Sequence, residues 1–298
     1  MRITTEILNK LAKDSVMERV KAQGLLAAYL YGSLPAGNPL LGGAADIDLC
    51  LIHIEEFPVD REIIRLSEEV HLDIVHHTRQ VYRQARELRR NPWMGPVLYS
   101  CKALYDPQHF IDFIQASVRG QYHQPENVIV RSRQLIEAAR QIWFTFDNEA
   151  YLTEAHRTYN YLNSLYLSAS SIANLSGKLL PTRQMLVAFA GAAESIGRGG
   201  FYAGLIGLLG GQNVEPAALK SWLPAWDETY LALPGGSTPP ALHRHRKTYY
   251  RRGIEALLES DRPLDSLWPL FFTWTELASL LGPDHPQFAS WFQAAEQL

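Results

Sequence analysis

Segments with the character of buried β-strands are confined to the first third of this chain, and this uneven distribution constrains the fold more than any other feature. Apolar runs at residues 25–31, 46–53 and 71–76 are rich in Leu, Ile, Val and Tyr. Beyond about residue 110 the apolar residues instead recur at helical spacing. We therefore expect an α+β protein, in which a small mixed-sheet domain (residues 1–110) is followed by an all-α helical domain (residues 115–298).

Apolar spacing and turn residues predict the elements of the first third. Residues 4–21 follow a helical period and stop at Gly24, a typical residue at the end of a helix. A short helix is expected over residues 60–70, and a highly charged helix over residues 79–90. Strands are expected at Leu25–Tyr31, Asp46–His53, His71–His76 and Lys102–Tyr105.

The remainder of the chain carries long helical patterns. Pro181 stands where a first-turn proline is favoured. The expected helices cover residues 126–146, 150–176, 181–196, 215–231, 242–259, 265–281 and 286–297. Within this part, an aromatic stripe indicates a core or a domain interface; it consists of Trp268, Phe271, Phe272 and Trp274.

Composition and charge exclude several classes of protein. A length of 298 residues suits two domains, and 47% hydrophobic with 20% charged residues is typical of a globular chain and not of a disordered one. The net charge of −3 provides no broad basic field for duplex nucleic acid. Two cysteines make no disulfide framework, which favours a reducing compartment. With no signal peptide and no apolar stretch long enough to span a bilayer, we expect a cytoplasmic protein without membrane contact.

A glycine-rich segment between the first two predicted strands carries the residues that indicate chemistry. The first strand runs into Gly32-Ser33, and twelve residues separate Ser33 from Asp46. The second strand then opens with Asp46-Ile47-Asp48. Because residues i and i+2 of a strand point to the same face, both carboxylates should project together while Ile47 enters the core.

The paired carboxylates predict a cation. Two carboxylates held ~4 Å apart repel by about 4 kcal/mol at an effective dielectric constant near 20, so Asp46 and Asp48 are costly neighbours unless a cation lies between them. Mg²⁺ is the natural occupant, because it favours a few carboxylates together with substrate phosphates. Asp73 is a third acid in an otherwise apolar strand. On a neighbouring strand it would complete a three-carboxylate cluster able to hold two metal ions.

The Gly32-Ser33 pair suits the phosphate end of a nucleotide. Glycine lets the backbone approach an anion closely, and a strand-to-helix turn offers free N–H groups. The hydroxyl of Ser33 adds one more donor. We therefore expect a nucleoside triphosphate on this turn, with its phosphates bridged to the acids by metal.

The order of these features resembles the pattern of the DNA polymerase β-like nucleotidyltransferase superfamily. The order is a hydrophobic strand, Gly32-Ser33, Asp46-Ile47-Asp48 and a later single acid. The resemblance covers residues 20–107, and its end, residues 95–107, is similar to the closing segment of small members of that superfamily. The helical region resembles, more loosely, the C-terminal domains of aminoglycoside nucleotidyltransferases, most of all at residues 175–183.

The resemblance implies a role for each candidate residue. Asp46 and Asp48 would bind Mg²⁺, and Asp73 would be a further metal ligand or the base toward the acceptor hydroxyl. Gly32 and Ser33 would hold the β- and γ-phosphates. The chain departs from the pattern in one respect: residues 34–45 contain no Lys or Arg, whereas many relatives carry a basic residue there.

These expectations lead to a Mg²⁺-dependent transfer of a nucleoside monophosphate, AMP by preference, from a nucleoside triphosphate, preferably ATP, to a hydroxyl group. A small-molecule acceptor is preferred, with an unidentified metabolite ahead of a cationic, aminoglycoside-like compound. One alternative is a nucleotidyltransferase that modifies a protein, as in toxin–antitoxin pairs. The other is a protein that binds nucleotide without catalysis, which the absence of a basic residue from the glycine-rich segment favours.

Several other polar residues have two interpretations. By the resemblance, a helical acid could act as the base and helical cations could reach phosphates, although solvated side chains are the preferred interpretation. The acids are Glu149, Glu154 and Glu194, and the cations are Arg157, Lys178 and Arg183. For His76-His77, a surface histidine is preferred over an imidazole near the acids. The basic and aromatic residues at 243–252 are interpreted as a solvated helix in preference to an RNA or phosphate contact.

Overall fold

The computed structural model describes residues 3–145, 152–234 and 238–298. It divides into two compact units, Met1–Val128 and Ile129–Leu298, and the division falls within the first turn of α5 (Pro125–Thr145). The protein is α+β, as expected, with one five-stranded mixed sheet and many helices. All the described strands belong to the first unit, and the described elements of the second unit are helices.

Five strands form the sheet of the first unit in the spatial order β3-β4-β2-β1-β5. β2 and β4 are parallel, and the other neighbouring strands pair antiparallel. The four strands predicted from apolar runs are confirmed. The strands are β1 (Leu25–Tyr31), β2 (Ala45–His53), β3 (Arg61–Arg65), β4 (Val70–Thr78) and β5 (Lys102–Tyr105).

The short helix predicted over residues 60–70 is wrong, because this segment forms β3 and the turn that leads into β4. Ile63 and Ile64 are β-branched and face opposite sides of the sheet, and Ile64 packs against the core beneath α1. The hydroxyl of Ser67 accepts hydrogen bonds from the backbone N–H groups of Glu69 and Val70, which closes the hairpin. Pairing with the edge of β4 therefore overrides a weak helical period.

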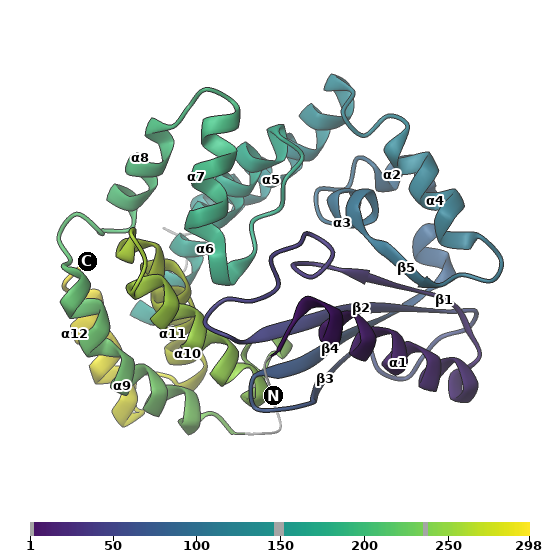
Figure 1. Cartoon of the computed structure of the whole chain (residues 1–298). Coiled ribbons are helices and arrows are strands. Elements are labelled where there is room, and N and C mark those ends of the chain that lie inside the picture. Colours follow the sequence, from purple (N-terminus) through teal and green to yellow (C-terminus); the bar gives the residue numbers. More distant parts are fainter. Residues whose placement is uncertain (1–2, 146–151, 235–237) are drawn as a thin grey trace. The chain divides into compact units, whose positions relative to one another are not determined.

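One face of the sheet is covered by α1 (Thr5–Gln23), confirming the predicted N-terminal helix. Thr4 caps its start, and Gly24, with a φ of 58°, ends it in the left-handed conformation that glycine adopts without strain. Leu8 and Val16 of α1 pack on Ile47 of β2. Figure 1 shows α1 and the helices α2–α4 on opposite sides of the sheet.

The other face is covered by helices that the sequence predicted only in part. Residues 79–90 form two short turns, η1 (Arg79–Tyr82) and α2 (Ala85–Leu88), in place of one helix. The helices α3 (Met94–Ser100) and α4 (Phe110–Arg119) follow and were not predicted. α4 buries Ile111, Ile114 and Val118 against this face and belongs to the first unit.

The second unit packs around α11 (Leu267–Leu281). Helices lie in each range predicted for it, but residues 182–184 and 244–246 form 3₁₀ turns, and residues 146 and 150–151 of two predicted helices lie outside the described residues. The helix at Gly200–Leu208 was not predicted. The aromatic stripe lies in the core of the second unit, where the indole N–H groups of Trp226, Trp274 and Trp291 donate to Thr273, Thr229 and Thr275. The other helices are α6 (Glu154–Leu175), α7 (Met185–Ser195), α8 (Gly200–Leu208), α9 (Pro216–Ala232), α10 (Lys247–Leu258) and α12 (Pro286–Ala295), with short 3₁₀ turns at residues 182–184, 240–242, 244–246 and 263–266.

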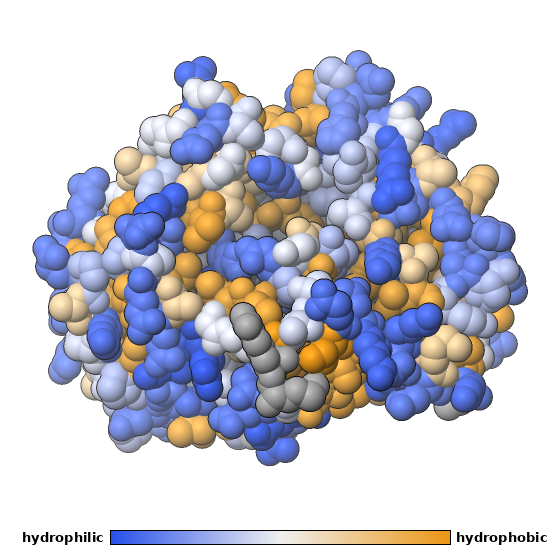
Figure 2. Space-filling model, in the orientation of Figure 1, coloured by the Kyte–Doolittle hydropathy of each residue, from blue (hydrophilic) through white to orange (hydrophobic). Residues whose placement is uncertain are grey.

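Surface composition agrees with this separation of core and exterior. Figure 2 shows hydrophilic side chains over much of the visible surface, with hydrophobic side chains between them. Within the described residues, no helix combines the length and the apolar character needed to cross a bilayer.

Candidate functional site

The pairing of three adjacent strands brings the predicted site residues of the first unit together. Tyr31, which precedes Gly32, lies opposite Asp48 in the antiparallel pairing of β1 with β2. Asp48 lies opposite Asp73 in the parallel pairing of β2 with β4. Because neighbouring strands lie about 4.8 Å apart, the Gly32-Ser33 turn, Asp48 and Asp73 form one row across the sheet.

Strand alternation puts the three acids on one face of the sheet. Ile47 on β2 and Leu72 and Ile74 on β4 enter the core beneath α1, so the acids between and beside them face the opposite side. Asp46 and Asp73 are buried, with 5% and 0% exposure, whereas Asp48 is half-buried.

Gly32 approaches the carboxylate of Asp48 so closely that a side chain at this position would displace it. Its φ is 77°, a conformation that favours glycine, and a Cβ at this position would lie 1.9 Å from Oδ2 of Asp48. The Oγ atom of Ser33 is buried and has no hydrogen-bond partner within the described residues. Residues 32–37 form turns and no helix begins there, so the expected strand-to-helix turn is wrong. The turn places a bare backbone and a hydroxyl beside the acid of the next strand.

Arg61 on β3 is a site residue that the sequence analysis missed. Its Nε and Nη2 atoms donate hydrogen bonds of 2.6 Å and 2.5 Å to the two carboxylate oxygens of Asp73. Ile63, and not Arg61, lies directly opposite Asp73, so the guanidinium reaches the acid along the diagonal of the antiparallel pair. The predicted helix at 60–70 hid this signal, because only a strand places Arg61 beside the acids.

Two more residues of this face border the acids. His71, 2% exposed, lies opposite Asp46 in the β2–β4 pairing. Burial, together with the charges of Asp48 and Asp73, raises the pKa of Tyr31 well above its usual value of 10. The phenol of Tyr31 is therefore a neutral hydroxyl beside two carboxylates.

Farther along the same face, a polar cluster surrounds Cys50. Its Sγ lies 3.4 Å from Nδ1 of His77 and 3.4 Å from the hydroxyl of Tyr82, which in turn lies 2.8 Å from His77 Nδ1. Burial raises the pKa of Cys50 to about 11 and lowers that of His77. The thiol stays protonated at neutral pH, so this Cys–His contact is no activated nucleophile.

The interpretation of His76 as a surface residue is wrong. His76 is 7% exposed and lies on the α1 side of the sheet, where its Nδ1 is 2.9 Å from Nε2 of His53. The ring of Phe57 stacks on both imidazoles. Burial and the neighbouring His53 lower the pKa of His76 to about 4. This pair faces away from the acids.

A cavity of about 720 Å³ lies elsewhere in the first unit, between α2 and α4. Its lining includes Arg86, Arg89 and Arg90. Arg89 donates to the amide oxygen of Gln121, and Nε of Arg90 donates to Oδ1 of Asn127 at 3.0 Å. None of the predicted site residues lines this cavity.

Most of the candidate residues of the second unit lie on its surface. Glu149 lies outside the described residues. Glu154, Glu194, Arg157 and Lys178 are exposed, which agrees with the interpretation as solvated side chains. Arg183 is buried, with its guanidinium 3.6 Å from the centroid of the Tyr249 ring.

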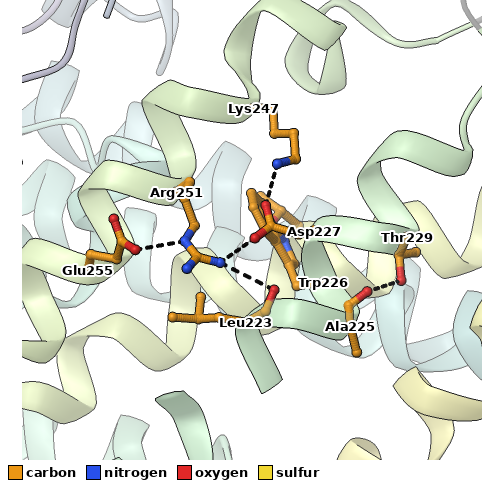
Figure 3. A network of polar contacts seen from close by, with 9 residues as sticks. Leu223, Ala225, Trp226, Asp227, Thr229, Lys247, Arg251 and Glu255 are labelled. Carbon is orange, nitrogen blue, oxygen red and sulfur yellow. Dashed lines mark hydrogen bonds and ion pairs between the residues drawn. The ribbon is translucent and has the colours of Figure 1, made fainter. Parts of the chain in front are cut away.

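The basic and aromatic segment at residues 243–252 is not a solvated helix. Asp227 of α9 forms ion pairs with both Lys247 and Arg251 of α10, and Arg251 also contacts Glu255 at 2.9 Å (Figure 3). Tyr249 and Tyr250 are buried in the core. These charges hold two helices together, so the earlier interpretation is corrected.

Glu276 on α11 is a titratable residue that the sequence analysis did not select. Burial raises its pKa to about 7, against a hydrogen bond from Tyr159 that lowers it. Its neighbours in the chain, Thr275 and Leu277, are buried. A core-facing helix position was expected to be apolar, and no local pattern distinguishes this acid from the solvated ones.

The donor set of the first unit fits a hard divalent cation at Asp46 and Asp48, since both present carboxylate oxygens to the same face. Asp73 adds no open donor in this structure, because both its oxygens accept from Arg61. Within the described residues, no three His, Cys, Asp or Glu side chains are grouped to hold a metal ion. The residues thus fit one cation between two carboxylates.

The chain was compared with protein families and with curated proteins. No protein-family model matches this chain, and no curated protein is significantly similar to it.

Proposed function

We propose that this protein is a Mg²⁺-dependent nucleotidyltransferase that moves AMP from ATP to a hydroxyl group of a small molecule. The observation that carries the proposal is the contact between the Gly32-Ser33 turn and Asp48. A bare backbone beside a carboxylate is what a metal-bridged triphosphate needs, because the phosphates then meet N–H donors on one side and the cation on the other.

Each residue has a role in this proposal. The backbone at Gly32 and Ser33, with the buried Ser33 hydroxyl, would hold the β- and γ-phosphates. Asp46 and Asp48 would hold Mg²⁺, which when bound would polarise the α-phosphate and neutralise the leaving pyrophosphate. The phenol of Tyr31, kept protonated by its surroundings, would donate a hydrogen bond beside the acids.

One observation favours a second candidate function, nucleotide binding without catalysis. Arg61 engages both oxygens of Asp73, the residue that the superfamily resemblance makes a metal ligand or a base. If catalysis requires an open Asp73, the site as described would bind nucleotide and not turn it over.

The test is a transfer assay with ATP labelled at the α-phosphate, in Mg²⁺, over aminoglycosides, lincosamides, polyols and cell-lysate fractions, with pyrophosphate release measured in parallel. Asp48→Asn should lower pyrophosphate release at least about 100-fold, since even a residue that only supports a metal ligand accounts for 10–100-fold. Asp14→Asn, an exposed acid on α1, is the matched control and should keep full activity.

The remaining outcomes separate the alternatives. Label found only on protein bands would favour a protein-modifying nucleotidyltransferase. Binding of ATP in calorimetry without pyrophosphate release from any acceptor would favour the binding protein. Equal activity of Asp48→Asn and the unmodified protein would exclude the mechanism.

A further inference from the structure

The ion pair between Arg61 and Asp73 joins an exposed arginine to a fully buried carboxylate of the candidate site. The Asp73 side chain is 0% exposed, and the Arg61 side chain is 36% exposed. Both carboxylate oxygens are engaged in a fork geometry that only arginine offers. A buried carboxylate held in this way has a permanent counter-charge, because arginine does not lose its proton in proteins.

We infer that the guanidinium of Arg61 takes the place that a second divalent cation would occupy, so that the site binds one cation, at Asp46 and Asp48. This inference rests on the proposed function. It makes Asp73 a positioning residue, which holds Arg61 and does not coordinate metal.

The pairing of β3 with β4 fixes the position of Arg61 beside Asp73. β3 pairs with β4 along its whole length, from Arg61 opposite Val75 to Arg65 opposite His71, so the Cα of Arg61 is held in a fixed register. Asp73 is next to Asp48 in the parallel pairing. The positive charge is therefore fixed one strand away from the paired acids.

Arg61 supplies the positive charge that the glycine-rich segment lacks. Residues 34–45 contain no Lys or Arg, and Arg61 brings a cation to the acids from β3, an edge strand of the sheet. Because its side chain is partly exposed while two of its nitrogens bind Asp73, the guanidinium can also face a phosphate oxygen. The structure would thus meet the charge of a triphosphate with one metal ion and one arginine.

The test counts bound Mn²⁺ per chain from the electron paramagnetic resonance signal of the free ion, without nucleotide. The unmodified protein should bind one ion. Arg61→Met should bind two, because the carboxylate of Asp73 then lies next to Asp48 without the counter-charge of Arg61, and Arg61→Met with Asp73→Asn should return to one. Arg65→Met is the matched control and should bind one, since Arg65 lies on the same strand but donates to the backbone oxygen of Ser67.

Two ions in the unmodified protein, or one ion in a folded Arg61→Met variant, would overturn the inference and leave the proposed function standing. No ion in any variant would overturn both. If Arg61→Met does not fold, the inference is tested on the unmodified protein by the ¹⁵N resonance of the Arg61 Nε atom. The signal is assigned by its loss in Arg61→Lys. It should keep its hydrogen-bonded shift in saturating Mg²⁺, and its displacement by Mg²⁺ would overturn the inference.

Discussion

A Cβ atom on Gly32 would lie 1.9 Å from Oδ2 of Asp48, so a side chain at Gly32 would overlap the carboxylate. Gly32 follows the last residue of β1, and that residue lies opposite Asp48 on β2. This contact joins the phosphate-binding part of the proposed site to its metal-binding part. It also gives the sharpest local test of the site, because a single methyl group would displace a proposed ligand.

Gly32→Ala should lower nucleotidyl transfer about 100-fold, the loss that a shift of about 1 Å in a reacting group can cause. Gly37→Ala is the matched control: its φ of 86° imposes similar backbone strain, of about 1–2 kcal/mol, but nothing lies within 4 Å of its Cβ. Gly32→Ala should therefore lose at least as much stability as the control in thermal unfolding, and only Gly32→Ala should lose activity while folded. Equal activities would contradict the proposed role of the contact.

The tryptophan–threonine pairs of the second unit should stabilise its core. Thr273→Val keeps the shape of the side chain but removes the acceptor of the buried Trp226 N–H group. An unsatisfied buried donor costs about 1–3 kcal/mol, which urea unfolding followed by tryptophan fluorescence would measure. Thr145→Val is the control, because that hydroxyl is exposed and donates to the backbone oxygen of Ile142. A loss no greater than that of the control would show that the pair contributes nothing.

Stability should fall in weak acid because of His76. Its pKa is lowered to about 4 in the folded protein against an ordinary 6.5, so the unfolded chain binds more protons between these values. The free energy of unfolding should thus decrease as the pH falls from 6.5 toward 4, with His53 acting in the same direction. His76→Gln should flatten this dependence in urea titrations at several pH values, whereas the exposed His123→Gln should not. The same slope in both variants would contradict the assignment.

Glu276 should act in the opposite direction. Its pKa is raised to about 7 from an ordinary 4.5, so the folded protein binds the extra proton and stability falls as the pH rises from 4.5 through 7. Glu276→Gln should gain stability relative to the unmodified protein over this range, by at most about 3.5 kcal/mol at about 1.4 kcal/mol per pKa unit. Urea midpoints at pH 5 and pH 8 would measure the gain. The exposed Glu194→Gln should show none, and a pH-independent difference for Glu276→Gln would argue against a buried acid.

Local patterns predicted the parts of the molecule whose period is unambiguous. β1 and β2 are long apolar runs, and the alternation along β2 placed Asp46 and Asp48 on one face with Ile47 on the other, as the structure has them. The left-handed turn at Gly32 and the helix end at Gly24 follow from the backbone freedom of glycine. The grouping of Gly32, Asp48 and Asp73 could therefore be predicted from the sequence.

Only the tertiary structure decided which partners these elements meet. Residues 61–65 carry too few positions to distinguish a helical from a strand period, and the open edge of β4 made them a strand. That choice brought Arg61 to Asp73, just as packing against α9 paired Lys247 and Arg251 with Asp227. The charge of a residue and the spacing of apolar residues around it can be read from the local sequence. The residue of opposite charge that it contacts comes from a segment distant in the chain, and the packing of the two segments against each other determines that contact.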